Sequence, residues 1–313
     1  MKTSRNWIIS ATIIIILVLA MLVFLIQPKS SSTPVTSTSS SGVIEIVAAE
    51  NFWGSLISQL GGTHVHVVSI VSDPNADPHE YESNATNARE VANASYVIEN
   101  GAGYDTWMEK LLSAGGNPDR KILNVANMLG KKDGSNPHFW YYPDYVNQVI
   151  SKMETDLISV DPLNANYYRS QYAQLQTELK PYQDRVASIS KQFGGTKIAS
   201  TESIFVYPAQ SLGLTLVSPT EFMNAIDEGN DPSAQSVISF ESLLKNNQVK
   251  VLIYNEQTVT PITLTMKKLA GDANIPIVGI TETIQPPDTS FQDWMTAELI
   301  NLQNALNADA LGK

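Results

Sequence analysis

The chain of 313 residues contains no cysteine. It therefore cannot form disulfides, bind a metal through thiolates, use a cysteine nucleophile or carry a lipid on a cysteine side chain. Positive charge is also scarce, because 20 Lys and Arg stand against 31 Asp and Glu, which gives a formal charge of −11. An acidic surface repels phosphate backbones and attracts cations, so we expect no nucleic-acid partner.

Acidic residues are absent from the first 42 positions, although this segment carries basic ones. Its uncharged run 7–26 is long enough, at about 1.5 Å per helical residue, to cross the core of a bilayer. We therefore expect residues 1–27 to form a membrane anchor or a cleaved signal segment, with the remaining chain outside the cytoplasm. Residues 28–42 are rich in Ser and Thr, which is typical of a flexible linker.

From residue 43 onward, short apolar runs alternate with amphipathic stretches. This alternation predicts βαβ units and therefore an α/β fold with mostly parallel sheets. The expected strands are IEIVAA (44–49), HVHVVSIV (64–71), SYVIEN (95–100), KILNVAN (121–127), TKIAST (196–201), TLVSPT (215–220), VKVLIYNE (249–256) and IPIVGIT (275–281).

The middle of the chain has a different pattern, because apolar and aromatic residues recur there every three or four positions. This spacing predicts one amphipathic helix over 161–194, bent at Pro181. A helix of that length can run along two lobes. We therefore expect an N-terminal α/β lobe over 43–160 and a C-terminal α/β lobe over 195–313, joined by the bridging helix.

Two of the four histidines, His79 and His138, lie in Pro-His loops of the first lobe. Both loops follow a predicted parallel strand, and open α/β sheets bind ligands at the carboxyl ends of their strands. Two histidines in matching loops indicate a metal site. The other pair, His64 and His66, shares one face of a predicted strand, which we expect to face solvent.

The second lobe contains no histidine, so carboxylates must complete any metal site that spans both lobes. Glu202 and Glu282 are the candidates, because each follows a predicted strand of that lobe. Two neutral imidazoles and two carboxylates around a divalent ion sum to zero charge, which lowers the cost of burying the cluster.

Five stretches carry a resemblance to a known family. The chain resembles the metal-binding solute receptors of ABC transporters, a zinc and manganese group that includes the streptococcal adhesin-type receptors. The matching stretches are DPHEYE (77–82), NPHFW (136–140), DPLNANYYRSQYAQL (161–175), STESIFVYPAQSLGL (200–214) and IPIVGITETI (275–284).

The resemblance implies two α/β lobes bridged by one helix, with a metal bound in the cleft between them by His79, His138, Glu202 and Glu282. Two positions depart from the usual pattern. Members of the family usually have Asp where this chain has Asn136, and Asp where it has Glu282. Glu256 is therefore an alternative fourth ligand.

The resemblance also implies a function. We expect a monomeric extracytoplasmic receptor, not an enzyme, that binds Mn²⁺ or Zn²⁺, with Fe²⁺ a further candidate, and delivers it to an ABC permease. The third ligand is often Glu in manganese-type members, so Glu202 favours manganese. Two alternatives are a metal-dependent hydrolase, which would need an open coordination position, and a surface adhesin or scaffold on the Ser/Thr-rich tether.

Overall fold

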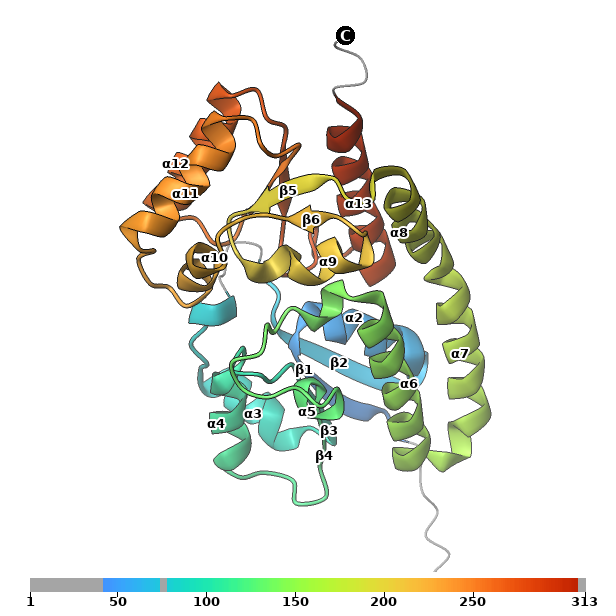
Figure 1. Cartoon of the computed structure of the whole chain (residues 1–313). Helices are drawn as coiled ribbons and strands as arrows, with labels where there is room; N and C mark the ends of the chain where they lie inside the picture. The colour runs from blue at the N-terminus through green and yellow to red at the C-terminus, as the bar shows by residue number, and fades with distance from the viewer. Residues whose placement is uncertain (1–41, 74–77, 309–313) are drawn as a thin grey trace, which may run out of the picture. The chain divides into compact units, whose positions relative to one another are not determined.

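The computed structural model describes residues 42–73 and 78–308, which form two α/β lobes (Figure 1). The first lobe has a parallel sheet of order β2-β1-β3-β4, and the second has a parallel sheet of order β6-β5-β7-β8. The predicted fold class is confirmed. The strands are β1 (Ile44–Glu50), β2 (Val65–Val71), β3 (Tyr96–Glu99), β4 (Lys121–Asn124), β5 (Lys197–Ser200), β6 (Thr215–Leu216), β7 (Leu252–Asn255) and β8 (Ile277–Ile280).

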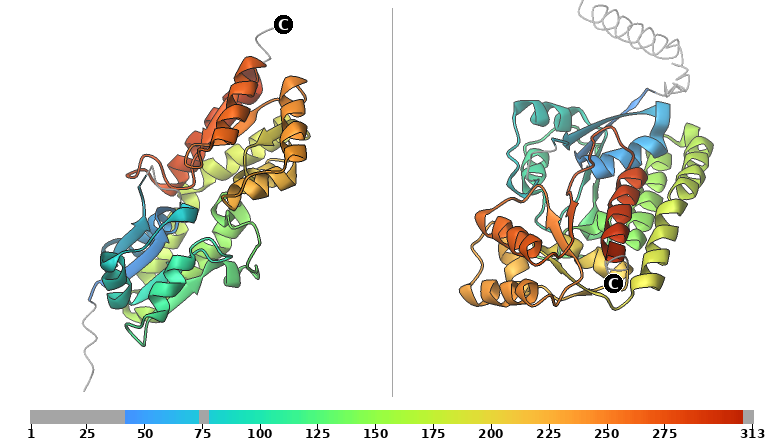
Figure 2. Two further views of the ribbon diagram at one scale, coloured as in Figure 1. Left: turned by 90° about the vertical axis from the view of Figure 1, so that its left-hand side faces the viewer. Right: turned by 90° about the horizontal axis from the view of Figure 1, so that it is seen from above.

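Helices connect the strands within each lobe (Figures 1 and 2). The first lobe contains α2 (Asn51–Gly61), α3 (Ala85–Asn93), α4 (Thr106–Ser113), α5 (Val125–Met128) and α6 (Pro143–Val160). The second lobe contains α9 (Val206–Ser211), α10 (Thr220–Asp227), α11 (Ala234–Lys245), α12 (Pro261–Asp272) and α13 (Phe291–Asn307).

Local sequence explains where several of these elements begin. The central strand β1 is buried along nearly its whole length, as expected for an apolar run inside a parallel sheet. Helix α12 begins after Thr260, whose side chain accepts the backbone N–H of Thr263, and Pro261 occupies its first turn. Helix α13 begins in the same way after Ser290, whose side chain accepts the N–H of Asp293.

The segment expected to be one helix is divided in the structure into a 3₁₀ turn (Pro162–Asn164) and two consecutive helices, α7 (Ala165–Glu178) and α8 (Lys180–Phe193). The break falls at Leu179, two residues before Pro181, because proline lacks the N–H that would continue the helical ladder. Helix α7 packs on α2 and α6 of the first lobe, whereas α8 packs on α13 of the second (Figures 1 and 2).

The sequence prediction missed helices α6 and α10 and extended two strands, 121–127 and 215–220, into the helices that follow them. The apolar residues of α6 follow helical spacing from Val146 to Leu157, so the signal was present in the sequence. Strand β4 ends at Asn124 and not at 127, because the Asn124 side chain accepts the N–H of Asn127 and caps α5.

The largest apolar core includes buried residues of both lobes. Trp140, just after the second Pro-His loop, stacks on Phe52 with ring centroids 4.0 Å apart. The neighbouring ring of Tyr141 lies 5.8 Å from that of Trp294 in α13. Asn51 at the start of α2 exchanges two hydrogen bonds with the backbone of Ile284, at 2.9 and 3.3 Å. The contacts of Tyr141 with Trp294 and of Asn51 with Ile284 fix loops of the two lobes against each other.

Within residues 42–73 and 78–308, no helix has both the length and the apolar character needed to cross a membrane. The segment expected to be an anchor, residues 1–27, and nearly all of the expected linker lie outside the described residues.

Candidate metal centre

The four residues predicted to bind metal all lie in loops or turns that lead away from the sheets. His79 lies in a 3₁₀ turn (Pro78–Glu80) after β2, and His138 directly precedes another (Phe139–Tyr141). Glu202 follows β5 and directly precedes a 3₁₀ turn (Ser203–Phe205), and Glu282 follows β8. These loops meet between the lobes, where parallel sheets place ligands.

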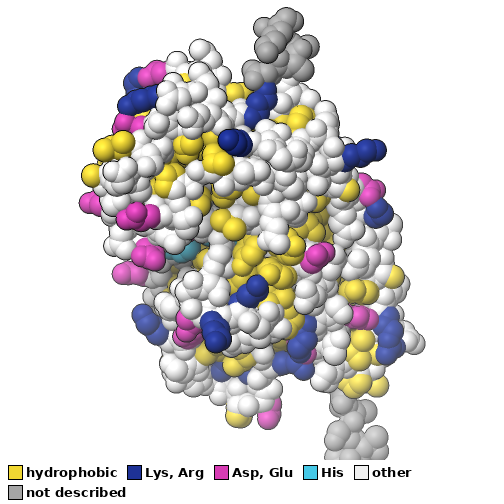
Figure 3. Space-filling model, viewed as in Figure 1, with side chains coloured by type: hydrophobic (Ala, Val, Ile, Leu, Met, Phe, Trp, Pro, Cys, Tyr) yellow, Lys and Arg dark blue, Asp and Glu magenta, His cyan; other side chains and the backbone are white. Residues whose placement is uncertain are grey.

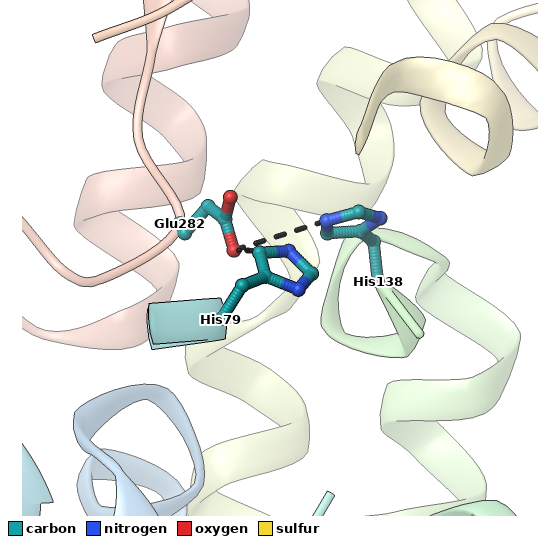
Figure 4. A group of neighbouring side chains, drawn as sticks. All are labelled: His79, His138 and Glu282. Atoms are coloured by element: carbon teal, nitrogen blue, oxygen red, sulfur yellow. Dashed lines mark ion pairs between the residues drawn. The ribbon is translucent and has the colours of Figure 1, made fainter. Parts of the chain in front are cut away.

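Three of these side chains converge on one point (Figure 4). One ligand atom from each of His79, His138 and Glu282 lies within 4.8 Å of the others. The Oε2 atom of Glu282 is 3.4 Å from Nε2 of His79 and 3.8 Å from Nε2 of His138 (Figure 4). Tyr104, which sequence reasoning missed, donates its hydroxyl to the same Oε2 at 2.6 Å.

Glu202 lies outside this group of three but is linked to it. Its side chain is fully buried, and its Oε1 accepts a hydrogen bond from the Asn255 amide, which also donates to Oε1 of Glu282 at 2.8 Å. The alternative ligand Glu256 is exposed, and its carboxylate lies over Gly279 and outside the group of three. Asn255 ends β7, so the strand-end rule could have drawn attention to it.

Hydrogen bonds set the tautomer of His138. Its Nδ1 lies 2.9 Å from Oδ1 of Asn136, whose Nδ2 donates to the carbonyl oxygen of Ser203 at 2.8 Å. A carbonyl can only accept, so the Asn136 amide oxygen must face the histidine, and Nδ1 must carry the proton. Nε2 is therefore left as a lone-pair donor. It is buried and has no hydrogen-bond partner in the described part of the chain, which suits a metal ligand.

The charges at the centre also suit a cation. Burial lowers the pKa of His138 to about 3, so the imidazole is neutral at physiological pH. Burial alone would raise the pKa of Glu282, but the two histidines and the hydrogen bond from Tyr104 outweigh it and lower the pKa to about 2. An ionised carboxylate beside a neutral imidazole is the protonation state that divalent transition metals require.

The centre opens into a cleft of about 1080 Å³ that residues of both lobes line, among them His79, Tyr104 and Asp227. Histidine is visible in a hollow of the surface, flanked by acidic side chains (Figure 3). Asp227 and Glu228 supply acidic groups to the wall of the cleft. A cation therefore has a negatively charged path to the buried ligands.

The other two histidines do not join the cluster. His66 is exposed and its Nδ1 lies 2.6 Å from a carboxylate oxygen of Glu45. The ring of His64 lies 4.6 Å from that of Tyr167 in α7. His66 thus faces solvent as expected, whereas His64 is partly covered by the helix that packs on this edge.

Two α/β lobes that enclose a cluster of histidine and carboxylate side chains define the class of two-lobed solute-binding proteins. Residues 46–305 match the family model described as zinc-uptake complex component A, periplasmic, and the chain belongs to this family. The predicted resemblance is confirmed. The family consists of components of metal uptake and not of enzymes, in agreement with the prediction.

Two relatives and one solved structure illustrate the likeness. The chain is 26% identical over 254 residues to the manganese-binding lipoprotein MntA of Halalkalibacterium halodurans, covering 78% of this chain and 81% of that protein. It is 18% identical over 260 residues to the high-affinity zinc uptake system protein ZnuA of Bacillus subtilis, covering 76% and 80%. The periplasmic zinc-binding protein TroA from Treponema pallidum has the same fold, with a TM-score of 0.72 and 14% identity over 83% of this chain and 98% of that chain.

The neutral state of buried His138 predicts how the stability of the metal-free protein depends on pH. An unfolded histidine binds a proton near pH 6.5, whereas folded His138 stays neutral down to about pH 3. In this window the unfolded state binds the extra proton. The free energy of unfolding therefore decreases by about 1.4 kcal/mol for each unit by which the pH is lowered.

His138→Gln should remove this contribution. In urea unfolding with chelator present, the stability of the wild type relative to His138→Gln should therefore decrease between pH 6.5 and pH 4. His66→Gln, at an exposed histidine, serves as the control and should follow the wild type. Parallel curves for wild type and His138→Gln would contradict the assignment of a neutral imidazole.

Proposed function

We propose that this chain is an extracytoplasmic receptor that binds one divalent transition-metal ion and delivers it to the membrane permease of an ABC transporter. The observation that carries the proposal is the convergence of His79, His138 and Glu282 between the lobes. Membership of a zinc-uptake family and the likeness to manganese-binding and zinc-uptake proteins support it.

Glu202 completes the proposed ligand set. It is buried in the same loop region and shares the Asn255 amide with Glu282. Two imidazole nitrogens and two carboxylate oxygens would then surround the ion, and the total charge of ion and ligands would be zero. A neutral cluster is the form in which charged groups can be buried at low cost.

The proposed cargo is Mn²⁺ or Zn²⁺, with Fe²⁺ also within the range of this ligand set. Zinc binds most nitrogen and oxygen sites more tightly than manganese does, whereas carboxylate ligands suit manganese. The two relatives described above are named for different metals, one for manganese and the other for zinc.

Membership of a family of metal-uptake components argues against the hydrolase alternative, and a ligand set completed by Glu202 would leave the metal no open position. A hydrolytic metal needs an open position for water, and structural or carrier sites lack one. The adhesin alternative gives no reason for the convergence of His79, His138 and Glu282 on one point.

Residues 7–26 are the proposed membrane anchor. The relative MntA is named a lipoprotein, but this chain contains no cysteine that could carry a lipid. An uncharged segment of this length would instead attach the protein to the membrane by crossing the bilayer core. The linker 28–42 would then let the folded lobes reach the permease from the membrane surface.

Metal binding should stabilise the protein, since only the folded state brings the ligands together. At a free metal concentration of 100 times Kd the gain is about 2.7 kcal/mol, which corresponds to a rise in Tm of roughly 5–10 °C for a protein of this size. Differential scanning fluorimetry of chelator-stripped protein with Zn²⁺ or Mn²⁺ measures this rise.

His79→Ala should abolish the rise in Tm, whereas His66→Ala, which removes an exposed histidine of the same lobe, should retain it. Equal melting temperatures with and without either metal in the wild type would exclude the receptor function.

The anchor predicts where the chain is found after cell fractionation. The full chain should remain in the membrane pellet after washing with high salt and should enter solution with detergent, because an apolar span is held by the bilayer core. A variant lacking residues 1–41 should be released from the membrane. Recovery of the full-length chain in the salt wash would exclude the anchor without affecting metal binding.

A further inference from the structure

Asn255 lies between the two carboxylates of the proposed site. This residue ends β7 and is fully buried. Its Nδ2 donates to Oε1 of Glu202 and, at 2.8 Å, to Oε1 of Glu282. The hydroxyl oxygen of Thr258 lies 3.1 Å from the same nitrogen. A neutral amide thus separates two acidic groups that would otherwise face each other.

The orientation of this amide follows from its partners. Oδ1 of Asn255 accepts the backbone N–H of Gln257 at 2.9 Å. A backbone N–H can only donate and an ionised carboxylate can only accept. The amide must therefore turn its oxygen to Gln257 and its NH₂ group to the carboxylates, because the flipped amide would be repelled on both sides.

The two oxygens of Glu282 consequently have different partners. Oε1 accepts from Asn255, whereas Oε2 accepts the Tyr104 hydroxyl at 2.6 Å and faces Nε2 of His79 at 3.4 Å and Nε2 of His138 at 3.8 Å. The oxygen that faces the imidazoles is therefore the one that Asn255 does not hold.

This division of the oxygens affects how a metal can be coordinated. A carboxylate whose orientation is fixed with one oxygen toward the Asn255 amide and the other toward the imidazoles presents one oxygen to a metal between them, whereas a carboxylate free to rotate can present both. One oxygen from each of two carboxylates and one nitrogen from each of two histidines give four ligand atoms, the number that zinc prefers in closed sites. Manganese favours oxygen-rich sites of higher coordination number.

We infer that Asn255 is a positioning residue that determines metal specificity, because it holds one oxygen of Glu202 and one of Glu282 and so limits each carboxylate to a single metal bond. This inference rests on the proposed function. By this restraint Asn255 makes the site selective for zinc over manganese, even though two of the proposed ligands are carboxylates.

The test compares wild type with Asn255→Ala, which removes the amide, and Asn255→Ser, which keeps one hydroxyl donor. Thr263→Val is the matched control, because Thr263 is a fully buried residue of the same lobe that bonds Thr258 and Thr260 but neither carboxylate. Affinities for Zn²⁺ and Mn²⁺ are measured by competition with a chelating dye. X-ray absorption of the zinc-loaded proteins gives the coordination number.

Wild type should bind zinc through four nitrogen and oxygen atoms. Residues that orient metal ligands typically change affinity about 10- to 100-fold. Asn255→Ala should therefore weaken zinc binding by that amount and weaken manganese binding by less, which shifts the zinc-to-manganese affinity ratio about tenfold or more. Its zinc coordination number should rise above four. Asn255→Ser should shift the ratio in the same direction, and Thr263→Val should leave it unchanged.

Five- or six-coordinate zinc in the wild type would overturn the inference, and this measurement does not depend on the folding of any variant. An equal loss of both affinities in Asn255→Ala, with the ratio preserved, would also overturn it and leave Asn255 with a structural role. In both cases metal still binds, so the proposed function stands. Failure of the wild type to bind either metal would instead overturn the proposed function and the inference together.

Discussion

The arrangement of the cleft depends on one buried charge, the ionised carboxylate of Glu282. This side chain is fully buried, and the basic side chains beside it among the described residues are two histidines and neither lysine nor arginine. Tyr104 and Asn255 hold one oxygen each. A carboxylate in such surroundings is stable only when hydrogen bonds and positive charge satisfy it. A divalent ion between it and the imidazoles would supply the charge that these partners lack.

Hydrogen bonds between loops hold this carboxylate and the histidines in position. Asn136 links the His138 loop to Ser203 of the other lobe, and the hydroxyl of Tyr141 lies 2.7 Å from both the carbonyl oxygen of Thr281 and a carboxylate oxygen of Glu298. Gln257 accepts the backbone N–H of Glu282 at 2.6 Å. The His138 loop is therefore tied to the opposite lobe, and the Glu282 loop is tied both to its own lobe and to the opposite one. Asn136 both accepts from His138 and donates to Ser203, which an ionised aspartate at this position could not do.

Strand-end positions were predictable because apolar runs mark parallel strands and their carboxyl ends mark ligand loops. That rule indicates His79, His138, Glu202 and Glu282, and three of these four side chains converge in the structure. The same rule points to Asn255 at the end of β7, but the hydrogen bonds that Asn255 and Tyr104 make across long stretches of sequence were not predictable. The single helix over 161–194 was expected from its periodicity, but the missing N–H of Pro181 divides it. Helix α6 was missed although its apolar spacing is helical.

Residues of both lobes are proposed to hold a single ion in the cleft. A crystal structure of the zinc-loaded protein, with anomalous data collected at the zinc edge, tests this proposal most directly. We expect one anomalous peak in the cleft, about 2.0–2.2 Å from Nε2 of His79, Nε2 of His138 and one oxygen each of Glu282 and Glu202. A cleft without a peak, with zinc found only at exposed groups such as His66 and Glu45, would contradict it.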